Sequence, residues 1–182
     1  RFTFDGVNDY IYTPDLSSLI TAGSESHTLE VWVNVTDRGV VAQYSGTSTP
    51  SIDYYHSAIE ADNKDNLNFG LWNGTSITEI DTSNDIVPTS GFDQFVLVYD
   101  ASSTTLSCYR NGSSLSSTSV SWASPMDESP AKPFHILLGA SSGTNMGDGT
   151  YLDGNFGIVR VYNRALSSDE ILTNYEFNQD TF

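Results

Sequence analysis

Alternate residues of one segment carry the side-chain types that bind sugars. Trp72 and Asn68 share one face of the segment 67–72 if it is a strand, because successive side chains of a strand point to opposite faces. The other face is apolar and suits a core: Leu67, Phe69 and Leu71. The apolar side of a pyranose stacks on an aromatic ring, and its hydroxyls form directional hydrogen bonds with amides and carboxylates. Trp72 and Asn68 are therefore candidate ligand-binding residues.

The preceding strand-like segment, residues 52–60, carries a similar pair. Asp53 and Tyr55 share a face there, so an aromatic platform with amide and carboxylate groups follows if the two strands pair. Trp122, in a proline-rich segment, would lie at the rim of that platform. The alternative is that Trp72 and Tyr55 only pack beneath a loop or a helix.

A glycine-rich loop, residues 141–153, has side chains that suit calcium. Ca²⁺ binds several hard oxygen atoms on flexible loops. The loop offers such oxygens among glycines that let backbone carbonyls turn inward: Asn145, Asp148 and Asp153. Further acidic residues outside the loop are additional candidate ligands: Asp53, Asp62 and Asp65. The alternative is that all of them are solvated turn residues.

The charge balance excludes whole classes of partner. Lys and Arg total 7 against 23 Asp and Glu, which gives a formal net charge of -16. Nucleic acids and anionic membranes bind basic patches, so neither is an expected partner. No apolar run approaches the length of a membrane span, which argues against membrane insertion.

The composition favours a site of action outside the cell. Cys108 is the only cysteine, so no internal disulfide can form. Ser, Thr, Asn and Gly are abundant and lysine is nearly absent, which suits an extracellular, cell-surface or virion-surface module. The chain begins inside a strand-like segment, residues 2–4, and we expect a mature or excised piece of a longer protein.

Periodicity and turn signals predict a single all-β domain over residues 1–182. Two Asn-Gly dipeptides, at 73–74 and 111–112, are strong hairpin signals. The continuously apolar part of 92–100 is the candidate for a central strand, whereas residues 61–66 are expected to form a charged turn. The expected strands lie within the ranges 2–12, 28–35, 40–44, 52–60, 67–72, 77–81, 92–100, 106–110, 113–120, 134–138 and 151–163.

The last strand is followed by the clearest helix start in the chain. Ser167 can cap the first turn, and Glu170 three residues later completes a capping box. Leu166 and Ile171 flank the cap as a hydrophobic staple. A short helix is expected over residues 167–175. Many short strands with one helix predict a two-sheet antiparallel sandwich.

The order of motifs resembles the laminin G-like, or concanavalin A-like, jelly-roll modules, over about residues 2 to 177. The bacterial and viral branch is the most similar, and pentraxins are more distant. The resemblance implies two antiparallel sheets with one short C-terminal helix. It also implies binding of glycans or proteins, often with calcium. The motifs that carry it are Phe4-Asp-Gly-Val-Asn-Asp-Tyr10, Thr28-Leu-Glu-Val-Trp-Val33, Phe95-Val-Leu-Val-Tyr-Asp100, Cys108-Tyr-Arg-Asn-Gly112, Ile136-Leu-Leu-Gly139 and Val159-Arg-Val-Tyr-Asn-Arg-Ala-Leu-Ser167.

The chain departs from the family pattern at two calcium positions. Ala140-Ser-Ser142 stands where pentraxins have acidic and amide side chains, so their two-calcium site is not expected here. Gly157-Ile158 stands where many bacterial relatives have an acidic pair. Calcium therefore stays an open expectation that rests on the loop itself.

Catalysis is not predicted. Glycan-cleaving relatives of this shape carry carboxylates in the pattern Glu-x-Asp-x-x-Glu, which points acid and nucleophile into one cleft. The nearest stretch, Glu60-Ala-Asp62-Asn-Lys-Asp65, lacks the final Glu. His27, His56 and His135 have no partner at metal or triad spacing and are expected to be half-buried strand residues.

Two functions from different classes follow. The first is a non-catalytic, extracellular module for carbohydrate binding or adhesion. Its partners are neutral or cationic glycans, which it binds with or without the help of calcium. The second is a virion structural module, such as a capsid-decoration or tail domain, that acts through contacts with other virion or surface proteins. A glycan-cleaving enzyme is a minor third.

Overall fold

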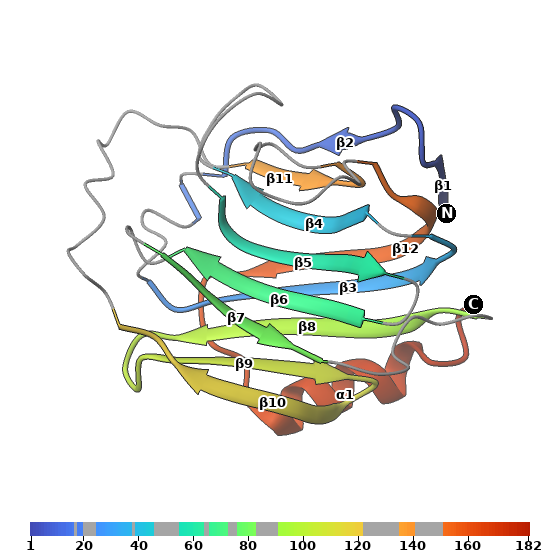
Figure 1. The fold of residues 1–182 in the computed structure, drawn as a ribbon. Coiled ribbons are helices and arrows are strands. Elements are labelled where there is room, and N and C mark those ends of the chain that lie inside the picture. Colours follow the sequence, from blue (N-terminus) through green and yellow to red (C-terminus); the bar gives the residue numbers. More distant parts are fainter. Residues whose placement is uncertain are drawn as a thin grey trace.

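Two antiparallel sheets lie face to face in the computed structural model (Figure 1), which describes residues 1–16, 18–19, 25–37, 39–45, 55–63, 66–72, 76–82, 91–121, 135–140 and 151–182. The first sheet has the order β1 (Phe2–Asp5), β12 (Asp153–Tyr162), β3 (His27–Val35), β8 (Asp93–Asp100), β9 (Thr105–Arg110) and β10 (Ser113–Ser119). The second has the order β2 (Ile11–Tyr12), β11 (His135–Leu138), β4 (Gly39–Ser45), β5 (Tyr55–Asn63), β6 (Asn66–Trp72) and β7 (Ile77–Asp81). The predicted all-β jelly-roll sandwich is confirmed.

The core lies between the sheets and follows the predicted alternation. Leu29, Val31 and Val33 of β3 meet Phe69 and Leu71 of β6 in one cluster of buried side chains. The apolar segment predicted to be central is β8, which lies between β3 and β9. Burial of these side chains is the main driving force for the fold.

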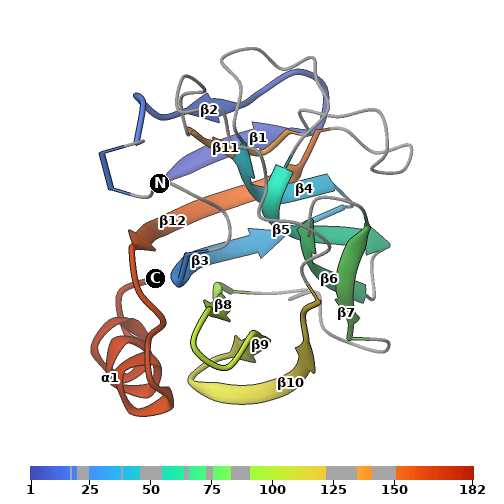
Figure 2. The ribbon, with the colours of Figure 1, turned by 90° about the vertical axis from the view of Figure 1, so that its left-hand side faces the viewer.

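The single helix of the described chain, α1 (Ser168–Asn178), covers the outer face of the first sheet (Figure 2). Leu166 and Ile171 are buried against Val96 and Val98 of β8. This cover explains why β3 is buried on both faces, although only one of its faces is wholly apolar. The helix also runs three residues beyond its predicted end, because Asn178 is buried and bonded to the Asn174 carbonyl.

The capping box is confirmed atom by atom. The Ser167 hydroxyl accepts a hydrogen bond from the Glu170 amide at 3.3 Å, and the Ser167 amide donates to Glu170 Oε2 at 2.9 Å. Two amides that would otherwise lack partners at the start of the helix are thereby satisfied.

Replacing Ser167 with alanine is expected to lower the free energy of unfolding by about 1 kcal/mol, because the Glu170 amide loses its acceptor. Urea denaturation followed by circular dichroism measures the change. Ser168→Ala, one residue inside the helix, is the matched control and should leave the midpoint almost unchanged. Equal midpoints for both variants and the wild type would contradict the capping role.

Of two predicted hairpins, one differs from its predicted boundaries and the other agrees with them. β5 continues to Asn63 and β6 starts at Asn66, so the connection is shorter than the charged turn expected over residues 61–66. The hairpin of β9 and β10 forms as predicted, with positive φ at both Asn111 and Gly112. β10 is the outermost strand of the first sheet, and its serine-rich residues are mostly exposed, with a register shift between Ser114 and Ser116.

Candidate functional site

Three polar side chains form a row on the face of the second sheet that looks away from the first sheet, here called the outer face. Asn68 of β6 pairs with Glu60 of β5 on one side and with Asp81 of β7 on the other. Residues paired across antiparallel strands share a face. The next pair along the strands, Ile59 and Phe69, belongs to the core, so the row points outward. A carboxylate-rich row of this kind accepts hydrogen bonds from hydroxyl groups.

Asn68 is chemically incomplete within the described residues. Its Oδ1 atom is buried and has no hydrogen-bond donor among them. Ionised carboxylates such as those of Glu60 and Asp81 are acceptors only, so neither can supply the missing hydrogen. A buried acceptor without a donor costs free energy unless a ligand or a water molecule satisfies it.

The backbone register bears on the predicted aromatic platform. β5 and β6 pair, and Trp72 alternates with Asn68 along β6. The β4–β5 pairing slips between Tyr44, which faces Ser57, and Ser45, which faces Tyr55. The side chains of Tyr55 and Trp72, and the residues Asp53 and Trp122, lie outside what the structure describes, so the platform stays a prediction.

Small residues lie between the polar row and the Trp72 end of the sheet. Ala58 of β5 pairs with Gly70 of β6 on the outer face. A glycine inside a strand has no side chain above it and allows another molecule to approach the backbone closely. Both residues are nevertheless buried, with Ala58 only 1% exposed, so this part of the outer face is closed to solvent in the structure.

Of the three loop residues predicted to bind calcium, Asp153 alone lies within the described residues. It begins β12, faces Asp5 of β1, and its carbonyl accepts hydrogen bonds from the amides of Thr36 and Asp37. Asn145 and Asp148 lie outside the described residues. In the ranges that the structure describes, no three His, Cys, Asp or Glu side chains gather to hold a metal ion. Calcium stays a prediction that depends on residues 141–150.

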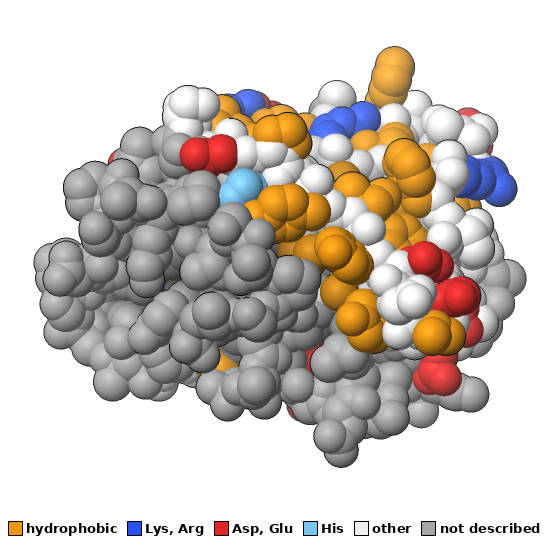
Figure 3. All heavy atoms as spheres, turned by 90° about the horizontal axis from the view of Figure 1, so that it is seen from above, with side chains coloured by type: hydrophobic (Ala, Val, Ile, Leu, Met, Phe, Trp, Pro, Cys, Tyr) orange, Lys and Arg blue, Asp and Glu red, His pale blue; other side chains and the backbone are white. Residues whose placement is uncertain are grey.

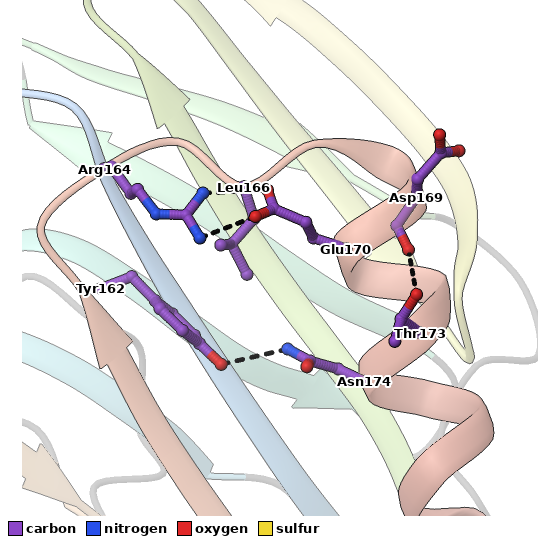
Figure 4. A pocket seen from close by; sticks show the side chains of 7 residues that line it. All are labelled: Tyr162, Arg164, Leu166, Asp169, Glu170, Thr173 and Asn174. Atoms are coloured by element: carbon purple, nitrogen blue, oxygen red, sulfur yellow. Dashed lines mark hydrogen bonds and ion pairs between the residues drawn. The ribbon is translucent and has the colours of Figure 1, made fainter.

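A separate pocket of about 250 Å³ lies where β12 meets α1 (Figure 4). Its charged groups bond one another. Both guanidinium nitrogens of Arg164 donate to Glu170, at 2.7 and 2.9 Å, and this bonding lowers the pKa of Glu170 to about 2. Asn174 donates to the Tyr162 hydroxyl at 3.0 Å. These contacts fix the helix to the sheet, so the pocket is a weaker candidate site than the outer face.

Beneath that pocket lies a buried carboxylate that was not predicted from the sequence. Glu30 of β3 is fully buried. Its carboxylate accepts hydrogen bonds from Arg160 at 2.8 Å and from Asn174 at 2.8 Å. Further donors to it are Trp32, Gln94 and Tyr162. A lone acidic residue inside an apolar strand is the sequence signal that could have indicated a buried ion pair.

The histidines are more buried than predicted. His27 and His135 are nearly inaccessible, and the side chain of His56 lies outside the described residues. His27 Nδ1 donates to the Glu25 carbonyl at 2.8 Å, so Nε2 accepts from the Ser57 hydroxyl at 2.6 Å. Cys108 is a buried core residue as expected, and burial raises its pKa to about 11.

His27 makes stability depend on pH. Burial lowers its pKa below the ordinary value of 6.5. Below that value the unfolded chain takes up a proton that the folded chain refuses, so stability is lost as the pH falls toward the folded pKa, by up to about 1.4 kcal/mol per pH unit. Urea midpoints at pH 7.5 and pH 5.5 measure this loss. His27→Gln should show a smaller difference between the two pH values, and an equal difference would assign the loss to other groups.

Comparisons with known proteins identify the fold. Residues 5–172 match the family model described as the concanavalin A-like lectin/glucanases superfamily. No curated protein matches the sequence. The chain is similar to the CBM40 of Ruminococcus gnavus IT-sialidase bound to α2,3-sialyllactose, at 16% identity and a TM-score of 0.64, over 92% of this chain and 97% of that one.

Two further solved structures share the fold. The SAP-like pentraxin of Limulus polyphemus is 13% identical with a TM-score of 0.64, over 95% of this chain and 80% of that one. The binding domain of botulinum neurotoxin serotype D/C is 15% identical with a TM-score of 0.70, over 98% of this chain and 44% of that one. Within the described residues, no helix has the length and apolar character needed to cross a membrane.

Proposed function

Because the chain belongs to the concanavalin A-like lectin/glucanase superfamily, we propose that it is a non-catalytic binding module that holds glycans on the outer face of its second sheet. The observation that carries this proposal is Asn68, whose buried Oδ1 lacks a donor within the described residues and lies between Glu60 and Asp81. Sugar hydroxyls supply donors of the kind that this row needs. Trp72 and Tyr55 would add the stacking surface.

The charge of the site selects the class of glycan. Glu60 and Asp81 flank Asn68, Glu79 faces Gly70 beside them, and the whole chain carries a net charge of -16. Sulfated or uronic chains would be repelled, so the preferred ligands are neutral or cationic glycans. The similar CBM40 bound to sialyllactose supports glycan binding in general. A shallow open face gives weak binding, with a Kd on the order of 0.1–1 mM per site, and several copies would supply avidity.

A glycan array that contains neutral, sialylated and sulfated chains tests this function. We expect array signals for neutral glycans and loss of these signals for Asn68→Ala. Incubation of the protein with the bound glycans should release no reducing ends, because no hydrolysis is expected. Asn163→Ala, an exposed asparagine at the end of β12, is the matched control and should bind as the wild type does. An absence of binding together with stable assembly onto virion or surface proteins would favour the structural role instead.

The proposed function includes calcium, which Asp153, Asn145 and Asp148 would bind. We expect calcium to raise the melting temperature and a chelator to lower it, because a ligand that binds only the folded state stabilises it by mass action. Differential scanning calorimetry with Asp153→Ala and Asp148→Ala measures the effect, and Asp180→Ala serves as the control. A melting temperature indifferent to both calcium and chelator would remove the metal from the account.

A further inference from the structure

The helix-covered face of the first sheet has a slot beside α1, and the chain fills it with the ring of its own Phe182. β12 carries an extra residue there, Gly157, because its pairing with β3 shifts between Phe156 and Ile158. A Cβ atom added at Gly157 would overlap the Phe182 ring, so the ring lies directly against the backbone. A glycine inside a strand allows this close approach. The slot therefore exists because residue 157 has no side chain.

Aromatic rings and one cation surround Phe182. Its ring stacks on Phe92, with centroids 4.4 Å apart and planes inclined by 23°, and its centroid lies 5.8 Å from that of Trp32. The Arg1 guanidinium lies 5.1 Å from the Phe92 centroid and 5.6 Å from the Phe182 centroid. Both distances suit a cation–π contact. We call the residues around Phe182 the ring slot: Gly157, Trp32, Phe92 and Arg1.

The ring slot joins residues from opposite ends of the sequence. Arg1 precedes β1 and Phe182 follows α1, and Figure 2 shows the two chain ends near each other. Basic side chains are sparse in this acidic chain, as the side of the molecule in Figure 3 shows. The other arginines within the described residues each bind a carboxylate: Arg110, Arg160 and Arg164. The position of Arg1 over two rings therefore indicates a specific contact.

Trp32 connects the ring slot to the buried carboxylate of Glu30. The Tyr175 ring of α1 stacks on the Trp32 ring, with centroids 5.8 Å apart and planes inclined by 7°. Phe182 lies at the same centroid distance from Trp32. The Trp32 indole Nε1 donates to Glu30 Oε1 at 3.1 Å, and Trp32 is only 1% exposed. Tyr175 and Phe182 therefore help to close the indole and its hydrogen bond to water.

The helix itself buries little apolar surface against the sheet. Ile171 and Asn178 are the buried residues of α1. Much of its attachment is polar, since Asn174 donates to Glu30 at 2.8 Å and Asn178 accepts from Arg160 at 3.2 Å. Segments with few buried apolar contacts open at a lower free energy than the whole domain. Contacts outside the helix can therefore control whether α1 stays on the sheet.

We propose that Phe182 is a latch that controls the release of α1 from the first sheet. With the ring in its slot, α1 is held down and the hydrogen bond between Trp32 and Glu30 is closed to water. When the ring leaves, α1 detaches as a unit and the sandwich stays folded, because the core between the sheets contains no residue of α1. This latch is independent of the proposed glycan-binding function.

Hydrogen exchange measured by NMR tests the latch. The reporters are the amides of α1 and the indole Nε1–H of Trp32, and the β8 amides report unfolding of the whole domain. In the wild type, both reporters should show similar opening constants, roughly a hundredfold above that of the β8 amides, because α1 opens before the sandwich does. Phe182→Ala should raise the opening constants of both reporters by roughly a further tenfold, since the stacking contacts are lost. Phe177→Ala is the matched control and should raise neither, because Phe177 is 84% exposed on α1.

Gly157→Ala is a second variant that leaves Phe182 unchanged. Residue 157 has no positive φ, so its backbone accepts alanine, but the added Cβ takes the space of the Phe182 ring. We expect the same faster exchange as for Phe182→Ala, and the double variant should exchange about as fast as Phe182→Ala alone. Reporters that exchange only together with the β8 amides in the wild type would overturn the separate release of α1. Reporters unaffected by Phe182→Ala, or additive effects in the double variant, would overturn the role of the ring.

Discussion

Replacing Arg160 with methionine is expected to lower the free energy of unfolding by about 3 kcal/mol, because the substitution leaves the carboxylate of Glu30 buried without its cation. Glu30 has no exposed side-chain surface, so water cannot replace the lost partner. The remaining donors, among them Asn174 and Gln94, keep the loss near the lower end of the range for a broken buried pair.

Urea denaturation of Arg160→Met beside Arg164→Met measures this loss. Arg164 also binds a carboxylate, that of Glu170, but both side chains of that pair are largely exposed. Exposed ion pairs contribute little to stability, so Arg164→Met should move the midpoint far less. The double variant Glu30→Gln/Arg160→Met should recover part of the loss, because the unpaired charge is gone. Similar midpoints for the two single variants would show that the buried pair is no more important than the exposed one.

Trp72→Ala is expected to weaken glycan binding at least about tenfold, because the stacking surface for the sugar ring is removed while the hydrogen-bonding row remains. Titration with the neutral glycan that gives the strongest array signal measures the effect. Phe177→Ala is the matched control, since Phe177 is an aromatic residue of α1 with 84% of its surface exposed, on the helix that covers the other sheet. Binding that survives Trp72→Ala would move the site to the loops around Asp148 and Trp122.

Local patterns predicted the features that depend on neighbours in sequence. The apolar alternation of β6, the Asn111-Gly112 turn and the Ser167 cap are decided within a few residues, and each is present in the structure. The shared face of Asn68 and Trp72 is likewise predicted from one strand, and it stays a prediction because the side chain of Trp72 lies outside what the structure describes.

Features that depend on pairing between distant segments could not be predicted from the sequence. Glu30 and Arg160 meet because β3 and β12 are adjacent, although 130 residues separate them. The position of Asp81 beside Asn68 and the outward turn of His135 likewise follow from strand register. The slip in register at Tyr55 has no signal in the local sequence. A regular and an irregular strand would differ at this point only in which residue of β4 pairs with Tyr55.

The four sheet edges have a consequence for association between molecules. An edge strand offers unpaired amides and carbonyls to which another chain can add, and this is a common route to aggregation. The edges β1 and β2 are only 4 and 2 residues long, and β7 carries Glu79 and Asp81. The long edge β10 is broken by its register shift and presents serines, which gain little from burial. Together with mutual charge repulsion, these edges favour a module that can be displayed densely in many copies without fusing into fibrils.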